Sequence, residues 1–275
     1  MTDQARPSLT LVLPAYNEAA RLPDALDELF GYLGRSGPAR AGGRPASDLG
    51  EWDVLVVDDG STDATAAIVE ARPEAHRDAQ GGPRLRVLRI PHGGKGAAVR
   101  AGVLAATGDL VVFADSDMAT PPDQIPLLTR ALVDHDIALG SRVQPDGSDR
   151  RASQPLYRRV LGKVFHTLAA LWVTGPVPDP QCGFKGFRRD VGQDLFARQR
   201  ITSIVFDAEV IHLARRRGYT MAIVPVQWAD KRGSRMRVRP TLALAVLADL
   251  IRIPIIHRAV HRVVRPGVSA SAPEA

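Results

Sequence analysis

Apolar residues gather in short runs along the first half of this chain, and segments with helical spacing follow them. Such runs have the length of buried strands, whereas apolar residues three and four apart indicate helices. The expected strands are Leu9–Pro14, Val54–Val57, Leu85–Ile90, Leu110–Ala114 and Ile137–Leu139. The expected helices are Pro23–Leu33, Asp63–Ala71 and Gly96–Ala106. This alternation predicts an α/β fold with a mostly parallel, doubly wound sheet and helices on both faces.

The second half carries a sparser pattern. A helix is expected at Asp207–Arg217, between strands at Gly183–Arg188 and Met221–Trp228. A helical stripe of large apolar residues precedes them, and it is expected to pack in the core or to face a membrane. Its members are Leu161, Phe165, Leu168 and Trp172.

The segment Thr241–Val264 combines a long apolar surface with basic residues, and Pro254 is expected to kink it. A pair of amphipathic helices lying in a membrane interface fits this composition, and a soluble helix packed on the body is the alternative. No apolar run reaches the roughly 18 residues of a membrane-spanning helix. We therefore expect one domain over residues 1–239, followed by an interfacial segment and tail over residues 240–275.

The formal net charge of +6 is unevenly distributed. From Arg215 to Arg265 the chain has twelve Lys or Arg and only two Asp or Glu, so this part is a basic patch on a mildly acidic body. Nucleic acid, anionic lipid and a phosphorylated substrate would each suit such a patch. Nucleic acid is not an expected partner, because no nucleic-acid motif is present and aromatic residues make up only 5% of the chain.

Asp115-Ser116-Asp117 follows the apolar run at Leu110–Ala114. In open α/β sheets, ligands bind outside the carboxyl ends of the strands. Two carboxylates there suit a hard divalent cation such as Mg²⁺ or Mn²⁺, which takes its other ligands from substrate phosphates. A turn or a helix cap is the alternative for an isolated acidic pair.

Two more polar clusters follow strands that are expected to end at the same edge. Pro14–Glu18 can direct Tyr16 and Glu18 toward a ligand, or it can form a plain turn. In Asp58–Asp63, a carboxylate can accept the ring N–H groups of uracil or guanine. A tight turn with Ser61 or Thr62 capping the next helix is the alternative.

His92-Gly93-Gly94-Lys95-Gly96 precedes an expected helix. Its glycine spacing differs from the nucleotide-binding P-loop, and Gly96 replaces the hydroxyl residue that would contact magnesium, which disfavours a P-loop kinase or ATPase. A lysine at a helix N-terminus can still contact a phosphate.

In this order and spacing, these four motifs resemble the nucleotide-sugar domain of family 2 glycosyltransferases, which have the GT-A fold. The second half resembles the dolichyl-phosphate β-glucosyltransferase branch of that family. The motifs that carry this second resemblance are Asp115–Pro121, Gly140-Ser141-Arg142, Gln181-Cys182-Gly183-Phe184-Lys185, Phe206-Asp207-Ala208-Glu209 and Gly233-Ser234-Arg235. It implies a nucleotide-sugar half over about residues 8–142 and an acceptor half over about residues 143–239.

The resemblance also implies roles for individual residues. Asp115 and Asp117 would hold Mg²⁺ or Mn²⁺. The nucleotide sugar would contact Pro14, Tyr16, Glu18, Asp58, Asp59, Lys95, Asp115, Ser116, Asp117 and Gln181. The acceptor phosphate would contact Arg142, Arg158, Lys185, Arg232, Ser234 and Arg235. The catalytic set would be Asp117, Asp207, Glu209, Arg142 and Lys185, although Asp207 and Glu209 can instead stabilise the start of a helix.

The implied reaction is transfer of glucose from UDP-glucose to a polyprenyl phosphate, with inversion to a β-linked product. The expected location is peripheral, at the cytoplasmic face of a membrane. GDP-mannose as donor, a soluble acceptor, and a non-catalytic nucleotide-binding or scaffold protein are the alternatives. Cys182, the only cysteine, is expected to be a packed thiol.

Overall fold

The computed structural model describes residues 6–35, 50–76, 84–144, 146, 167, 169–229 and 240–263, with side chains from residue 245 onward in the last range. The sheet that organises them has seven strands in the order β3-β2-β1-β4-β6-β5-β7. Their bounds are β1 Leu9–Ala15, β2 Trp52–Asp58, β3 Leu85–Arg89, β4 Leu110–Ala114, β5 Ile137–Ser141, β6 Phe184–Arg188 and β7 Met221–Pro225.

Strand β6 is antiparallel to both of its neighbours, β4 and β5, whereas the other described pairings are parallel. The mostly parallel sheet predicted from the sequence is therefore confirmed.

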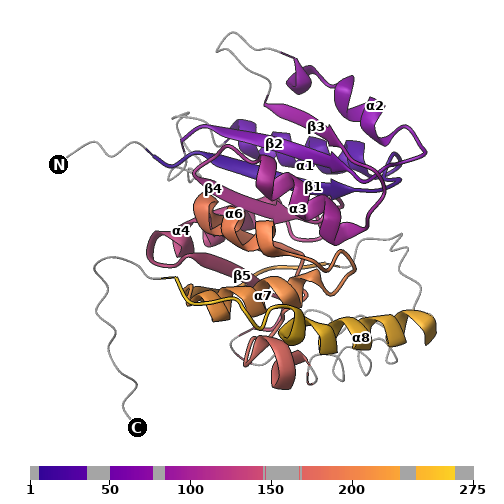
Figure 1. The fold of residues 1–275 in the computed structure, drawn as a ribbon. Coiled ribbons are helices and arrows are strands. Elements are labelled where there is room, and N and C mark those ends of the chain that lie inside the picture. Colours follow the sequence, from indigo (N-terminus) through magenta and orange to yellow (C-terminus); the bar gives the residue numbers. More distant parts are fainter. Residues whose placement is uncertain are drawn as a thin grey trace, which may run out of the picture.

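Helices cover both faces of this sheet (Figure 1). The α-helices are α1 Leu22–Arg35, α2 Thr65–Glu70, α3 Lys95–Ala105, α4 Ile125–Asp134, α6 Arg189–Arg198, α7 Phe206–Arg217 and α8 Pro240–Ile256. Three shorter helical turns are η1 Pro73–Ala75, η2 Pro122–Gln124 and the π-helix η4 Ala170–Thr174.

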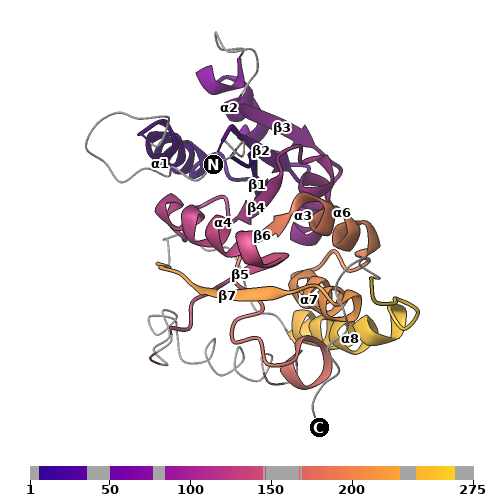
Figure 2. The ribbon, with the colours of Figure 1, turned by 90° about the vertical axis from the view of Figure 1, so that its left-hand side faces the viewer.

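The two faces of the sheet bury separate apolar cores. Helices α1 and α4 pack on one face, and α3, α6 and α7 pack on the other (Figure 2). Strand β4 shows how the sequence supplies both cores: Leu110 and Val112 belong to the first, and Val111 and Phe113 to the second. All five β4 residues are buried, as expected of an interior strand of a sheet that helices cover on both faces.

Helix α8 lies outside α7 at one end of the molecule (Figure 1). Its inner side chains Leu250 and Ile253 join a third apolar cluster with Val173 of η4 and Val205. Within the described part of the chain, no helix is both long and apolar enough to cross a membrane.

Several expectations need correction. Helices α4 and α6 were not predicted, and the strand expected at Met221–Trp228 ends at Pro225. A single helix, α8, replaces the predicted pair, because Pro254 lies only two residues before its end. Ser61 and Thr62 do not cap α2, because Ser61 Oγ instead accepts the backbone N–H of Asn17, at 2.9 Å. Most of the predicted helical stripe before Trp172 lies outside the described residues.

Candidate functional site

The carboxyl ends of β1, β2, β4 and β5 bring the predicted polar clusters to one edge of the sheet. Strand β6 runs the other way, so its beginning lies at this edge, and Phe184 pairs with Ala114. The segment Gln181–Gly183 is therefore adjacent to Asp115, although it is distant in sequence.

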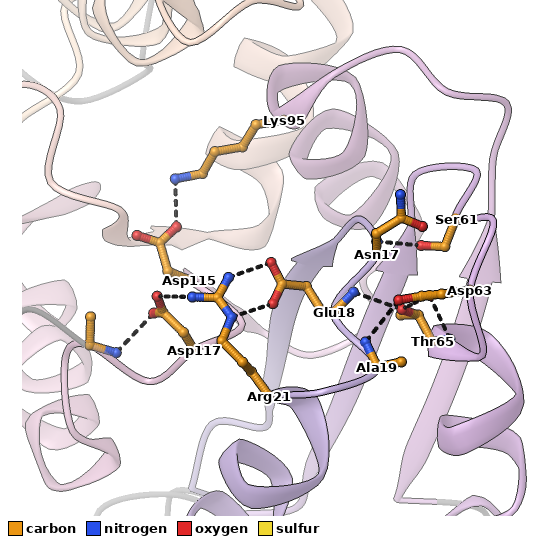
Figure 3. A network of polar contacts seen from close by, with 11 residues as sticks. Asn17, Glu18, Ala19, Arg21, Ser61, Asp63, Thr65, Lys95, Asp115 and Asp117 are labelled. Carbon is orange, nitrogen blue, oxygen red and sulfur yellow. Dashed lines mark hydrogen bonds and ion pairs between the residues drawn. The ribbon is translucent and has the colours of Figure 1, made fainter. Parts of the chain in front are cut away.

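Asp115 and Asp117 each face a cation (Figure 3). Lys95 Nζ lies 2.5 Å from Asp115 Oδ1. Arg21 NH1 lies 3.5 Å from Asp117 Oδ2, and the same guanidinium binds both carboxylate oxygens of Glu18, at 2.6 and 2.8 Å. Arg21 was not predicted as a site residue, although its i, i+3 spacing from Glu18 is a signal for an ion pair.

Burial and the neighbouring Asp115 carboxylate raise the pKa of Asp117. When two neighbouring carboxyl groups are partly withdrawn from water, ionisation of both is unfavourable unless a cation compensates their negative charge. The backbone N–H of Ala119 donates to Asp117 Oδ1 at 3.1 Å, which orients the carboxylate. The pair is therefore a place where an additional positive charge would be stabilised.

Positive and negative groups continue from Asp115 into the interior. Burial alone would lower the pKa of Lys95, but Asp115 and Asp207 outweigh it and raise the pKa. Asp207 Oδ1 lies 2.6 Å from the fully buried Lys185 Nζ, which also donates to the Cys182 carbonyl at 2.5 Å. Burial raises the pKa of Asp207, against the opposing effects of Lys185 and Lys95.

Gly183 packs directly against the Asp115 carboxylate. A Cβ atom at this position would collide with all three terminal atoms of that side chain. The glycine of the Gln-Cys-Gly-Phe-Lys motif therefore lets the start of β6 approach Asp115 closely, as happens where a backbone must come near a functional group.

The loop before Lys95 is held by Asp59. Its two carboxylate oxygens accept the N–H groups of Gly93 and Gly94, at 2.8 and 2.9 Å. The ring of His92 stacks on that of Tyr16, with 4.2 Å between the ring centres. Tyr16 remains exposed, so this stack presents an aromatic surface at the edge of the sheet.

The neighbouring cluster at Pro14–Glu18 is a tight, connected turn. Pro14 lies within β1, and Asn17 has a positive φ of 54°, a conformation that asparagine tolerates better than most residues. Asp58 Oδ1 accepts the N–H of Ser61 at 3.1 Å. Asp58 is buried and pairs with Ala15 of β1 in the sheet, so its turn and the Pro14–Glu18 turn lie next to each other.

Arg142 follows β5 and forms a two-pronged ion pair with Asp179. Nε and NH2 of the guanidinium each lie 2.7 Å from a different carboxylate oxygen, and the Arg142 N–H donates to Oδ2 at 3.0 Å. The guanidinium also lies over the Trp228 ring, 5.6 Å from its centre. Asp179 was not predicted as a site residue.

The family model for "Glycosyl transferase family 2" matches residues 10–196 of this chain, a span that contains the Asp115–Asp117 pair and the start of β6. The chain belongs to this family.

Curated relatives of this chain include several dolichyl-phosphate beta-glucosyltransferases. A dolichyl-phosphate beta-glucosyltransferase of Trichomonas vaginalis is 36% identical over 257 residues, which cover 91% of this chain and 72% of the relative. A dolichyl-phosphate beta-glucosyltransferase of Drosophila melanogaster is 34% identical over 86% of this chain and 71% of the relative. The enzyme of the same name from Homo sapiens is 30% identical over 85% of this chain and 71% of the relative. These matches confirm the resemblance found in the motifs.

Solved structures with the same architecture are more distant. Glucosyl-3-phosphoglycerate synthase of Mycobacterium tuberculosis, in complex with Mn²⁺, UDP-glucose and phosphoglyceric acid, has a TM-score of 0.60 at 20% identity, over 90% of this chain and 79% of that one. Mannosyl-3-phosphoglycerate synthase of Rubrobacter xylanophilus has a TM-score of 0.61 at 19% identity, over 96% of this chain and 79% of that one. This likeness confirms the predicted GT-A fold.

The structure brings together some of the residues expected from the family and separates others. Asp115, Asp117, Lys95, Asp207 and Lys185 form one cluster. Ser116, the residue between Asp115 and Asp117 in the sequence, is buried, and Gln181 is half-buried. Glu209 is fully buried on another side of α7, where it contacts His257. Four residues expected to contact the acceptor lie outside the described residues: Arg158, Arg232, Ser234 and Arg235.

The Asp115–Asp117 pair fits a divalent cation by its donor chemistry. Carboxylate oxygens are the ligands that Mg²⁺ and Mn²⁺ take, and two of them are sufficient when a substrate diphosphate supplies further oxygens. The described residues contain no group of three or more His, Cys, Asp or Glu side chains arranged to hold a metal ion.

Cys182 is buried, and burial raises the pKa of its thiol to about 11. A neutral thiol is a poor nucleophile. The prediction that Cys182 is a packed thiol is confirmed by its burial in the first apolar core.

Proposed function

We propose that this glycosyltransferase moves glucose from UDP-glucose to a polyprenyl phosphate of the dolichyl type and gives a β-linked product. The observation that carries the proposal is the Asp115–Asp117 pair with its cations Lys95 and Arg21, in a chain whose relatives are dolichyl-phosphate beta-glucosyltransferases. Carboxylates and cations placed together suit a substrate that carries both a diphosphate and a metal ion.

In the proposed reaction, an oxygen of the acceptor phosphate forms a bond to the anomeric carbon, and the bond from that carbon to the UDP oxygen breaks. In-line attack inverts the anomeric configuration. A phosphate oxygen is already anionic near neutral pH, so a strong general base is unnecessary. When bound, Mg²⁺ or Mn²⁺ would offset the charge on the departing diphosphate. Asp115 and Asp117 would hold it, and Lys95 would contact the diphosphate.

The exposed stack of Tyr16 on His92 is the proposed contact for the uracil ring, because flat aromatic surfaces stack on bases. Asp58 and Asp59 lie beside it at the carboxyl end of β2. Arg142, oriented by Asp179, is the proposed cation for the acceptor phosphate, because a guanidinium offers several donors in one plane.

The acceptor is a lipid, so we also propose that the protein docks on the cytoplasmic face of a membrane through α8 and η4. Large apolar side chains are exposed on both elements: Leu171, Trp172, Leu247, Ile251 and Ile255. Exposed Arg252, Arg258 and Arg262 flank them and would attract anionic lipid.

A donor screen tests the reaction. The purified protein is incubated with Mn²⁺, polyprenyl phosphate and one radiolabelled nucleotide sugar at a time, and label is counted in the organic extract. Label from UDP-glucose alone supports the proposal. Label from GDP-mannose alone would identify GDP-mannose as the donor in place of UDP-glucose. Label that appears only in a soluble acceptor would show that the acceptor is not a lipid. Nucleotide binding without transfer from any donor would indicate a non-catalytic protein.

A further inference from the structure

One buried and one part-buried polar contact connect the α8 region to α7 and to the loop between α6 and α7, residues 199–205. His257 Nε2, just after α8, lies 2.6 Å from Glu209 Oε1, and the two side chains are only 2% and 0% exposed. Ser203 Oγ donates to Asp249 Oδ2 of α8 at 2.7 Å. These contacts flank the apolar packing of Ile201 and Val205 on α8.

Glu209 also holds the loop itself. Its carboxylate accepts the N–H of Arg200 on Oε1 at 2.9 Å and the N–H of Ile201 on Oε2 at 2.8 Å. One side chain of α7 therefore joins three elements, and a buried carboxylate with this many partners fixes their relative positions. Its contacts are separate from the Lys185 pair of Asp207, two residues earlier on the same helix.

The same loop contacts the start of α3. The Thr202 carbonyl accepts the N–H of Gly96 at 3.0 Å, and Gln199 Nε2 donates to the Gly96 carbonyl at 3.0 Å. A Cβ atom at Gly96 would lie 2.8 Å from the Thr202 carbonyl oxygen, so the glycine allows this close packing. Lys95, the preceding residue, is the one that contacts Asp115.

We infer that Glu209 and His257 are positioning residues for binding of the donor diphosphate. They hold the 199–205 loop, the loop holds Gly96, and Gly96 fixes the backbone from which Lys95 reaches the Asp115 carboxylate. Neither side chain is required to touch the substrate. The inference rests on the proposed function, because it assigns Lys95 to the diphosphate.

The test measures binding of UDP with Mn²⁺ by calorimetry, together with kcat and KM for donor and acceptor. Glu209→Gln loses one of the carboxylate acceptors, and His257→Phe removes the ring nitrogens. Each is expected to raise the Kd for UDP and the KM for UDP-glucose by about three- to tenfold, with the acceptor KM unchanged. The conservative His257→Gln keeps an N–H donor toward Glu209 and is expected to retain most of the donor affinity.

A double-mutant cycle with Lys95→Met tests whether the effect passes through Lys95. In the Lys95→Met background, Glu209→Gln is expected to weaken UDP binding by less than about twofold further, because the contact it positions is already absent. Additive losses would overturn the inference. If Glu209→Gln does not fold, Ser203→Ala provides the same cycle through the part-buried contact to Asp249, with a smaller expected loss.

Asp136→Asn is the matched control. Asp136 is also a buried carboxylate, and it accepts the N–H and hydroxyl of Thr220 at 2.8 and 3.0 Å, at the opposite edge of the sheet. It is expected to lower the melting temperature without changing UDP binding. Wild-type protein that binds no UDP would refute the proposed function. Wild-type binding that Glu209→Gln and His257→Phe leave unchanged, or that Asp136→Asn weakens equally, would refute the positioning role alone.

Discussion

At the scale of single residues, the Asp115–Asp117 pair combines a functional requirement with a cost to the fold. The pKa of Asp117 is raised by burial and by Asp115, so the folded protein binds a proton there more readily than the unfolded chain does. At a pH above this raised pKa, the ionised Asp117 carboxylate therefore lowers the free energy of unfolding. The loss of stability disappears as the pH falls below the raised pKa toward the value of the unfolded chain.

Asp117→Asn is expected to abolish transfer while leaving the metal-free melting temperature at pH 7.5 unchanged or slightly higher. The amide oxygen can still accept the Ala119 N–H, and relief of the charge repulsion with Asp115 offsets the loss of the 3.5 Å ion pair with Arg21. Activity assays and calorimetry measure the two effects. Asp123→Asn, at an exposed position on the same connection, is the control and is expected to keep normal activity. Near-normal transfer by Asp117→Asn would contradict the metal assignment.

Lys95 and Lys185 both pair with carboxylates but are expected to differ in what they contribute. Lys185 is fully buried, so Lys185→Met leaves Asp207 unpaired in the interior and is expected to cost about 3–5 kcal/mol of unfolding free energy. The cost should increase with pH, because the isolated carboxyl then has to ionise. Lys95 is one-third exposed, and Lys95→Met is expected to cost less than about 1 kcal/mol.

Urea unfolding at pH 6 and pH 8 measures both free energies. Equal losses for the two variants, or a Lys185→Met loss that does not depend on pH, would show that Asp207 does not rely on Lys185 for its charge.

At the scale of elements, the start of β6 is shaped to fit Asp115. Gly183→Ala is expected to displace the Asp115 carboxylate and to lower kcat/KM by about a hundredfold, since a shift of about an ångström in a reacting group has that effect. Gly186→Ala, within β6, is the control, because its Cβ would meet mainly the flexible Leu132 side chain. Similar activity losses in both variants would indicate general damage to β6.

Helix α8 divides its apolar residues between an inner and an outer side. Replacing the outer residues Leu247 and Ile251 with Asp is expected to reduce flotation with anionic vesicles by more than tenfold, because each apolar side chain contributes about 1.5–3 kcal/mol on burial. Val133→Asp, at an exposed apolar residue of α4, is the control and should leave flotation unchanged. Unchanged vesicle binding by the α8 variant would reject the proposed docking surface.

The sequence predicted those elements whose pattern is local. The buried strands were found because their residues are apolar on both sides, as in Leu110–Ala114. Helix α4 was not predicted, although its buried Ile125, Leu128 and Leu132 have helical spacing and Pro126 lies in its first turn, where proline is favoured. Helix α6 was missed because charged residues and Gly192 dilute its apolar face.

The same distinction applies to the site. Strand ends located the residues around Asp59 and Asp115, because the polar residues follow apolar runs directly. Arg21 and Asp179 were missed as partners of Asp117 and Arg142, because those pairs are 96 and 37 residues apart in sequence. Their pairing is decided by the strand order, which the sequence pattern does not specify.

At the scale of the whole molecule, one sheet includes strands from both halves that the family resemblance implies, residues 8–142 and 143–239. Strands β4 and β5 both belong to the first half, and β6 of the second half lies between them, so the two halves share hydrogen-bonded strands. Urea unfolding is therefore expected to show a single transition. In variants that retain only one of the two tryptophans, the fluorescence of Trp52 and that of Trp228 should change with the same midpoint. Midpoints that differ would indicate halves that unfold separately.

The interior position of β6 in the sheet also has a consequence for the order of folding. Strand β5 leaves the ribosome well before β6, but its hydrogen-bonding partners β6 and β7 both follow it in the chain. The unpaired edges of β4 and β5 must therefore remain protected during synthesis until Phe184–Arg188 inserts between them. Contacts between such distant segments form slowly, and exposed strand edges favour aggregation. This step is where we expect the nascent protein to depend most on chaperones.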